Sequence, residues 1–114
     1  MVRVKVCGIT NKHDARMAVE AGVDALGFIF ARSQRIILPQ DARRIIQGLP
    51  PFVQSVGVFV NEEPANIRET MDFCGLDLVQ LHGDEPPELC ESLMPRCIKA
   101  IRVRSRSSLD RISA

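Results

Sequence analysis

The chain has 114 residues, of which 46% are hydrophobic and 25% are charged, and its formal net charge at pH 7 is +1. This length allows one domain at most, and the composition is typical of a globular protein and not of a disordered chain. The small net charge and the absence of Trp and Tyr argue against a nucleic-acid-binding protein.

No stretch of the sequence predicts a membrane span or a secretion signal. The longest apolar run, 25–31, is far too short to cross a bilayer, and the N-terminal residues alternate valine with charge. We therefore expect a cytoplasmic protein with four reduced cysteines, Cys7, Cys74, Cys90 and Cys97. None of them forms a Cys-x-x-Cys pair, so the spacing predicts neither a zinc site nor a dithiol redox site.

The first predicted strand and helix carry the first candidate for chemistry. Residues 2–6 alternate valine with basic side chains, which is the period of a β-strand. Cys7 and Gly8 end this strand in a turn, at the place where α/β proteins put their reactive groups. Asn11 can then cap a helix that runs to about Ala21.

The same strand-and-helix unit recurs along the chain. Further strands are predicted at 25–29, 55–59, 78–81 and 97–101. The later helices are predicted to begin near residues 39, 64 and 86, and another begins at 109–112. Such βα repeats form parallel sheets with right-handed crossovers. The pattern fits either an open doubly wound sheet or part of a (β/α)₈ barrel, although a closed barrel needs at least about 200 residues.

Four stretches stand out as signatures: V-K-V-C-G-I-T (4–10), D-A-L-G-F-I-F (24–30) with S-Q-R (33–35), V-G-V-F-V-N (56–61) and L-V-Q-L-H-G-D-E (78–85). In this order and spacing they resemble the phosphoribosylanthranilate isomerases, a family of (β/α)₈ barrels in tryptophan biosynthesis. The resemblance implies that residues 1–114 are a single partial barrel domain of about five βα units, with the C-terminal units absent.

The resemblance also implies an activity. Members of this family convert N-(5-phosphoribosyl)anthranilate to the corresponding aminoketose by an Amadori rearrangement. A general acid opens the ribose ring to a Schiff base, and a general base then removes the proton from C2′. No metal or organic cofactor is implied, because the iminium of the substrate itself accepts the electrons.

Three positions of this chain match the site residues of the family. Cys7 matches the general base, and Arg35 matches the arginine that holds the anthranilate carboxylate, a group that a guanidinium binds bidentately. His82 matches a substrate-binding position, but a histidine there serves equally well to cap the loop, and both interpretations stay open. The family's general acid lies at the end of the sixth strand and its phosphate loops follow strands seven and eight, so this chain has no assigned general acid.

Two alternatives remain beside the enzyme, whose activity we expect to be absent or impaired in the 114-residue chain. One is a non-catalytic half-barrel that dimerises or complements a separate C-terminal half through exposed strand edges. The other is an open flavodoxin-like sheet that binds a phosphorylated ligand, although Gly8, Ile9 and Thr10 make a sparse phosphate loop. A small phosphorylated molecule, and neither nucleic acid nor membrane, is the expected partner.

Overall fold

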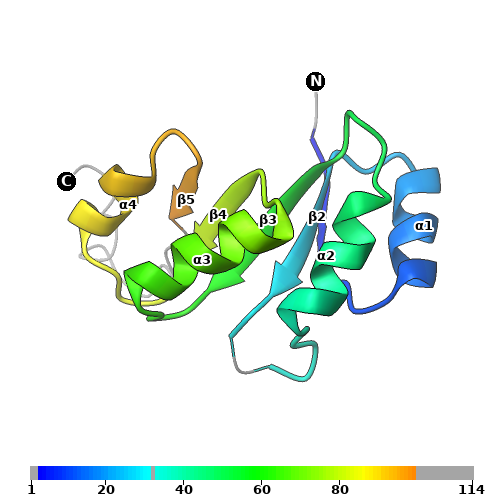
Figure 1. Ribbon diagram of the computed structural model, residues 1–114. Coiled ribbons are helices and arrows are strands. Elements are labelled where there is room, and N and C mark those ends of the chain that lie inside the picture. The colour runs from blue at the N-terminus through cyan, green and yellow to red at the C-terminus, as the bar shows by residue number, and fades with distance from the viewer. Residues whose placement is uncertain (1–2, 32, 100–114) are drawn as a thin grey trace.

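The computed structural model describes residues 3–31 and 33–99, which form a parallel sheet with helices along one face (Figure 1). The elements in chain order are β1 (Lys5–Cys7), α1 (Lys12–Glu20), β2 (Ala25–Ile29), α2 (Pro39–Gln47), β3 (Gln54–Phe59), α3 (Pro64–Cys74), β4 (Leu78–Leu81), α4 (Pro87–Leu93) and β5 (Cys97–Lys99). One helix follows each of the first four strands, as the βα repeat in the sequence predicts.

The strand order distinguishes between the two architectures that the repeat allows. The strands lie in the order β1-β2-β3-β4-β5, and every neighbouring pair is parallel. In a flavodoxin-like sheet the first strand would lie between the second and the third. The flavodoxin-like alternative is therefore wrong, and the sequential order is that of a barrel wall.

A bond across the inner face shows that the sheet is curved. Lys5 on β1 and Gln80 on β4 project from the same face of the sheet, and the ammonium of Lys5 donates to the side-chain oxygen of Gln80. On a flat sheet the two strands would lie about 14 Å apart, which is three strand spacings. Curvature brings them within reach of each other, so the sheet has the form of a partial barrel.

The helix boundaries follow from local chemistry. The side chain of Asn11 caps α1 by accepting a hydrogen bond of 2.8 Å from the amide of Asp14, as predicted. Gly75 ends α3 in the left-handed conformation with a φ of 76°, which a glycine adopts without strain. Leu38 stands at the N-cap of α2 and offers no side-chain acceptor, so that helix begins without a cap.

Buried side chains fill the space between the sheet and the helices. Alternate strand residues face the helices, among them Leu26, Phe28, Phe59, Val79 and Leu81. The helices contribute Ala15, Ala42, Ile45, Ile67, Met71, Leu89 and Leu93. Because a fully buried large apolar side chain stabilises a fold by about 1.5–3 kcal/mol, this layer holds the helices on the sheet.

The strand bounds differ from the predictions mainly at the two sides of the sheet. β2 and β4 have the predicted bounds, whereas β1 covers Lys5–Cys7, the residues that pair in register with β2. Residue 2 of the predicted first strand lies outside the described residues. The predicted strand residues 100–101 and the predicted helix at 109–112 lie outside the described residues. None of the helices in the described part of the chain has the length and apolar character needed to cross a membrane.

Candidate active site

The residues singled out in the sequence lie at one edge of the sheet. Cys7 is the last residue of β1, Arg35 lies in the loop after β2, and His82 directly follows β4. Because all strands are parallel, their carboxyl ends meet at the same edge, toward which the arrowheads of Figure 1 point. This is the edge at which (β/α)₈ barrels carry their active sites.

The thiol of Cys7 occupies space that a glycine leaves open. Cys7 pairs in register with Gly27 of β2, and its side chain is partly exposed on the inner face of the sheet. A Cβ atom at Gly27 would lie only 2.8 Å from Cys7 Sγ. Gly27 is thus a site residue that sequence reasoning missed, although a glycine inside a strand is a known signal of close approach.

Arg35 packs against the turn that follows Cys7. Gly8 has a φ of +88°, and a Cβ atom built on it would lie 2.6 Å from Arg35 Cδ and 3.2 Å from Nη1. The side chain of Arg35 therefore rests on the backbone immediately next to Cys7. The structure thus places Arg35 against the turn that follows Cys7, although the two residues lie far apart in the sequence.

The loop that carries Arg35 is tied back to the end of β2. The amide of Arg35 donates to Ser33 Oγ at 3.2 Å. Ile36 forms a parallel bridge with Ile29, and the amide of Ile37 donates to the Ile29 carbonyl at 3.0 Å. These bonds fix the direction of the loop, while the Arg35 side chain stays exposed.

His82 is held through its backbone. Its amide donates to the Phe59 carbonyl at 2.9 Å and so extends the pairing of β3 with β4 by one residue. The residue is exposed, and within residues 3–31 and 33–99 its imidazole makes no hydrogen bond. This arrangement does not support the loop-capping interpretation of His82 and leaves the ring accessible at the edge.

A buried carboxylate connects the neighbouring loops. Glu85 accepts hydrogen bonds of 2.8 Å from the amides of Asn61 and Gly83, and it forms an ion pair of 2.6 Å with Lys99. Asn61 has a φ of 50°, and its Oδ1 accepts a bond of 2.8 Å from the Asp84 amide. The loops after β3 and β4 and the end of β5 are thereby joined into one unit.

Glu85 precedes α4 but does not cap it, because the N-cap of α4 is Pro86 and the Glu85 carboxylate faces the loops. Burial alone would raise the pKa of Glu85. The hydrogen bonds from Lys99, Asn61 and Gly83 outweigh burial, so the pKa lies below its ordinary value and the group is ionised at neutral pH.

The edge presents a thiol, a guanidinium and an imidazole that solvent and small molecules can reach. Such a set can bind an anionic group through Arg35 and accept a proton at Cys7 or His82. In the part of the chain that the structure describes, no group of three or more histidine, cysteine and acidic side chains is placed to hold a metal ion.

The chain matches the family model described as N-(5'phosphoribosyl)anthranilate (PRA) isomerase over residues 4–114. The N-(5'-phosphoribosyl)anthranilate isomerase of Moorella thermoacetica is 59% identical over 114 residues, which is 100% of this chain and 51% of that protein. The protein of the same name from Geobacter sulfurreducens is 60% identical over 113 residues, covering 98% of this chain and 56% of that protein.

Solved structures agree with these relatives. The crystal structure of phosphoribosyl anthranilate isomerase from Thermotoga maritima has a TM-score of 0.94 at 53% identity, over 98% of this chain and 56% of that chain. A structure of the enzyme in complex with reduced 1-(o-carboxyphenylamino)-1-deoxyribulose 5-phosphate has a TM-score of 0.93 at 53% identity, over 98% and 59%. The chain spans about half the length of the curated relatives that it matches. With a family match that extends over nearly all its residues, the chain belongs to the N-(5'-phosphoribosyl)anthranilate isomerase family.

Proposed function

We propose that this chain supplies the general base and the carboxylate-binding residue of an isomerase in tryptophan biosynthesis. The reaction is the Amadori rearrangement of N-(5-phosphoribosyl)anthranilate to 1-(2-carboxyphenylamino)-1-deoxyribulose 5-phosphate. The observation that carries this proposal is the packing of Arg35 on Gly8, the residue that follows Cys7 in the chain. Family membership and the names of the relatives support the choice of reaction.

Each residue has a separate role. The Arg35 guanidinium binds the anthranilate carboxylate and places the sugar over the inner face of the sheet. Cys7 removes the proton from C2′ of the Schiff base, whose iminium takes up the electron pair. His82 provides a further polar contact with the substrate from the loop after β4.

The general acid and the phosphate-binding groups are proposed to come from the part of the relatives that this chain does not cover. The chain accounts for 56% of the Thermotoga maritima structure, and the resemblance assigns the acid and the phosphate loops to later strands. The 114-residue chain alone is therefore expected to be inactive or impaired, since loss of a general acid costs about 10²–10⁴-fold in rate.

A second candidate function is association with another chain. Among the described residues β1 and β5 are the outer strands of the sheet, and each pairs on one side only. Such edges are templates for pairing with a second copy or with a C-terminal half. The two candidates are compatible, because association would supply the missing groups.

An isomerase assay tests both candidates together. The purified chain is assayed alone and with the separately produced remainder of the Thermotoga maritima relative, and in each case with Cys7→Ser and with Cys90→Ser as a matched control. We expect activity only in the mixture, a loss of about 10²–10⁴-fold for Cys7→Ser, and no loss for Cys90→Ser. Activity that survives Cys7→Ser would refute the assignment of the base. A mixture that stays inactive although the two parts co-elute would refute the proposed reaction.

A further inference from the structure

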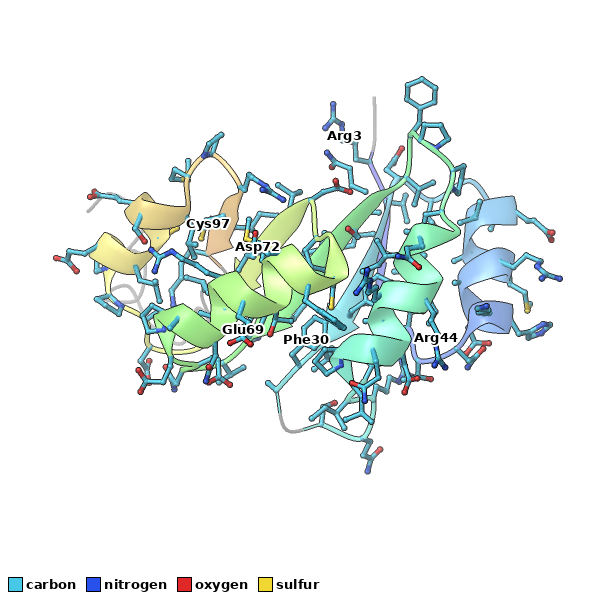
Figure 2. The ribbon with its side chains drawn as sticks, viewed as in Figure 1. Arg3, Phe30, Arg44, Glu69, Asp72 and Cys97 are labelled. Atoms are coloured by element: carbon cyan, nitrogen blue, oxygen red, sulfur yellow. The ribbon has the colours of Figure 1, made fainter. Side chains whose placement is uncertain are left out.

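Two cysteines away from the candidate active site face each other. Cys90 on α4 and Cys97 on β5 have their sulfur atoms 2.9 Å apart, and both side chains are partly buried between the helix and the strand. Figure 2 labels Cys97 where β5 lies beside α4. The isomerase proposed above uses neither residue.

The segment between the two cysteines is anchored. The amide of Arg96 donates to the Leu93 carbonyl at 2.9 Å, which holds the turn between α4 and β5. The side chain of Arg96 donates from Nε to the Asp77 carbonyl at 2.9 Å and also to the Leu76 carbonyl. The two sulfur atoms are therefore held in place by elements that are themselves fixed to the turn before β4.

We propose that Cys90 and Cys97 are a dithiol modification site that closes to an intramolecular disulfide when it meets a disulfide oxidant such as oxidised glutathione. The site joins α4 to β5, and it is independent of the proposed isomerase reaction. A disulfide bond needs a sulfur–sulfur distance of about 2.05 Å, so the thiols have to approach by less than about 1 Å.

The reaction is a pair of thiol–disulfide exchanges. The Cys90 thiolate attacks one sulfur of glutathione disulfide, which forms a mixed disulfide and releases one glutathione thiolate. The Cys97 thiolate then attacks the Cys90 sulfur, which forms the intramolecular bond and releases the second glutathione. The protein loses two protons and two electrons, and the oxidant is reduced to two thiols.

The environment of Cys97 determines the order of the two attacks. Burial, the hydrogen bond with Cys90 and repulsion from Cys90 and Glu85 raise the pKa of Cys97 to about 12, against a smaller opposite effect of Lys99. Cys97 is thus a thiol at neutral pH, and the first attack falls to Cys90. Once Cys90 is part of a mixed disulfide, its contribution to the raised pKa is gone, which favours the second attack.

The other two thiols are not competing partners. Cys74 is buried on α3, and its Sγ donates to the Pro39 carbonyl at 3.3 Å. Cys7 ends β1, which is separated from β5 by three strands in the sheet order. The structure therefore predicts one defined pair and not a mixture of disulfides.

Peptide mapping of the native chain identifies the product. The reduced chain is incubated with oxidised glutathione, its free thiols are alkylated, and the peptides are analysed without reduction. We expect the Cys90 and Cys97 peptides to be joined with the loss of two hydrogen atoms, and Cys7 and Cys74 to be alkylated. Cys97→Ser should stop at a glutathione adduct on Cys90. A wild-type chain that carries glutathione on Cys90 but keeps an alkylatable Cys97 would overturn the proposal.

A second measurement does not depend on the variants. The ratio of disulfide to dithiol is measured in glutathione buffers of known composition, for the native chain and for the chain unfolded in urea. Because the fold holds the thiols together, the native ratio should exceed the unfolded ratio by at least about tenfold. Equal ratios would show that the fold contributes nothing to the pairing, and the proposal would fail.

Discussion

At the β1–β2 side of this edge of the sheet, glycines make room for the side chains of Cys7 and Arg35, whereas at the β3–β5 side the buried carboxylate of Glu85 joins three segments. Gly27 leaves space for the Cys7 thiol, and Gly8 lets Arg35 rest on the backbone. On the other side Glu85 is almost fully buried and satisfied by Lys99 and two amides. The first side keeps its groups accessible, and the second keeps its loops rigid.

The two sides of this edge therefore have different structural roles. The proposed function requires a substrate to reach the Cys7 thiol and the Arg35 guanidinium. Both side chains are partly or fully exposed and make close contacts with glycine. The loop with His82 has to hold its position without a helix or strand of its own, and the ion pair of Glu85 supplies that. Substitutions that displace Cys7 or Arg35 should therefore affect binding or catalysis, whereas substitutions that remove Glu85 should affect mainly stability.

The largest expected effect on stability is that of Glu85→Ala. The substitution leaves Lys99 and the amides of Asn61 and Gly83 without their acceptor, and breaking a buried charge pair destabilises by about 3–5 kcal/mol. Since the Lys99 side chain is 23% exposed, we expect about 2–3 kcal/mol in urea unfolding. Glu69→Ala, at an exposed position on α3, is the control and should change stability by less than about 0.5 kcal/mol. Equal losses of unfolding free energy for Glu85→Ala and Glu69→Ala would show that the buried ion pair does not stabilise the β3–β5 side.

The next prediction uses two glycines with nearly the same positive φ, a conformation that would strain any other residue. Gly8 and Gly22 have φ values of +88° and +89°, but a Cβ atom at Gly22 meets nothing within 4 Å, whereas at Gly8 it meets Arg35. Substitution by Ala should cost each position about 1–2 kcal/mol in unfolding free energy. Only Gly8→Ala should also displace Arg35 and weaken anthranilate binding, measured by titration of the complemented enzyme. If Gly22→Ala weakened binding as much, the contact between Gly8 and Arg35 would have no functional meaning.

Lowering the pH should reduce the stability that Glu85 contributes at the β3–β5 side. The pKa of Glu85 is lower in the folded chain than the value of about 4.3 for an unfolded glutamate. Its contribution to stability is therefore complete above the unfolded pKa and is lost as the pH falls through the folded pKa. The difference in unfolding free energy between the wild type and Glu85→Gln should be constant near pH 7 and shrink below about pH 4. A difference that stays constant down to pH 3 would contradict the lowered pKa.

The sequence predicted local features better than contacts between distant segments, for a physical reason. The apolar runs of β2 and β4 are bounded by turn residues, so local patterns were sufficient to predict these strands, and the signature stretches put Cys7 and Arg35 after strands. Glu85 pairs with Lys99 on another strand, and Gly27 matters only through its register with Cys7. Such contacts depend on how segments pack, which no local spacing reveals. The same holds for Cys90 and Cys97, whose spacing matches no redox motif.

The smallest expected effect is that of a new N-cap for α2 at position 38, on the β1–β2 side. This change leaves Cys7 and Arg35 in place. Leu38 stands at the N-cap of α2, where the Arg35 loop ends, and it is 58% exposed with no side-chain acceptor. Leu38→Ser supplies an acceptor for the free amides of the first turn, which is worth about 0.5–1 kcal/mol relative to Leu38→Ala. Thermal unfolding of the two variants isolates the cap, because both remove the leucine side chain. Since Arg35 is held by Ser33 and Gly8 and not by the cap, anthranilate binding should be the same in both. Tighter binding in Leu38→Ser would mean instead that motion of the loop with Arg35 limits the affinity for anthranilate.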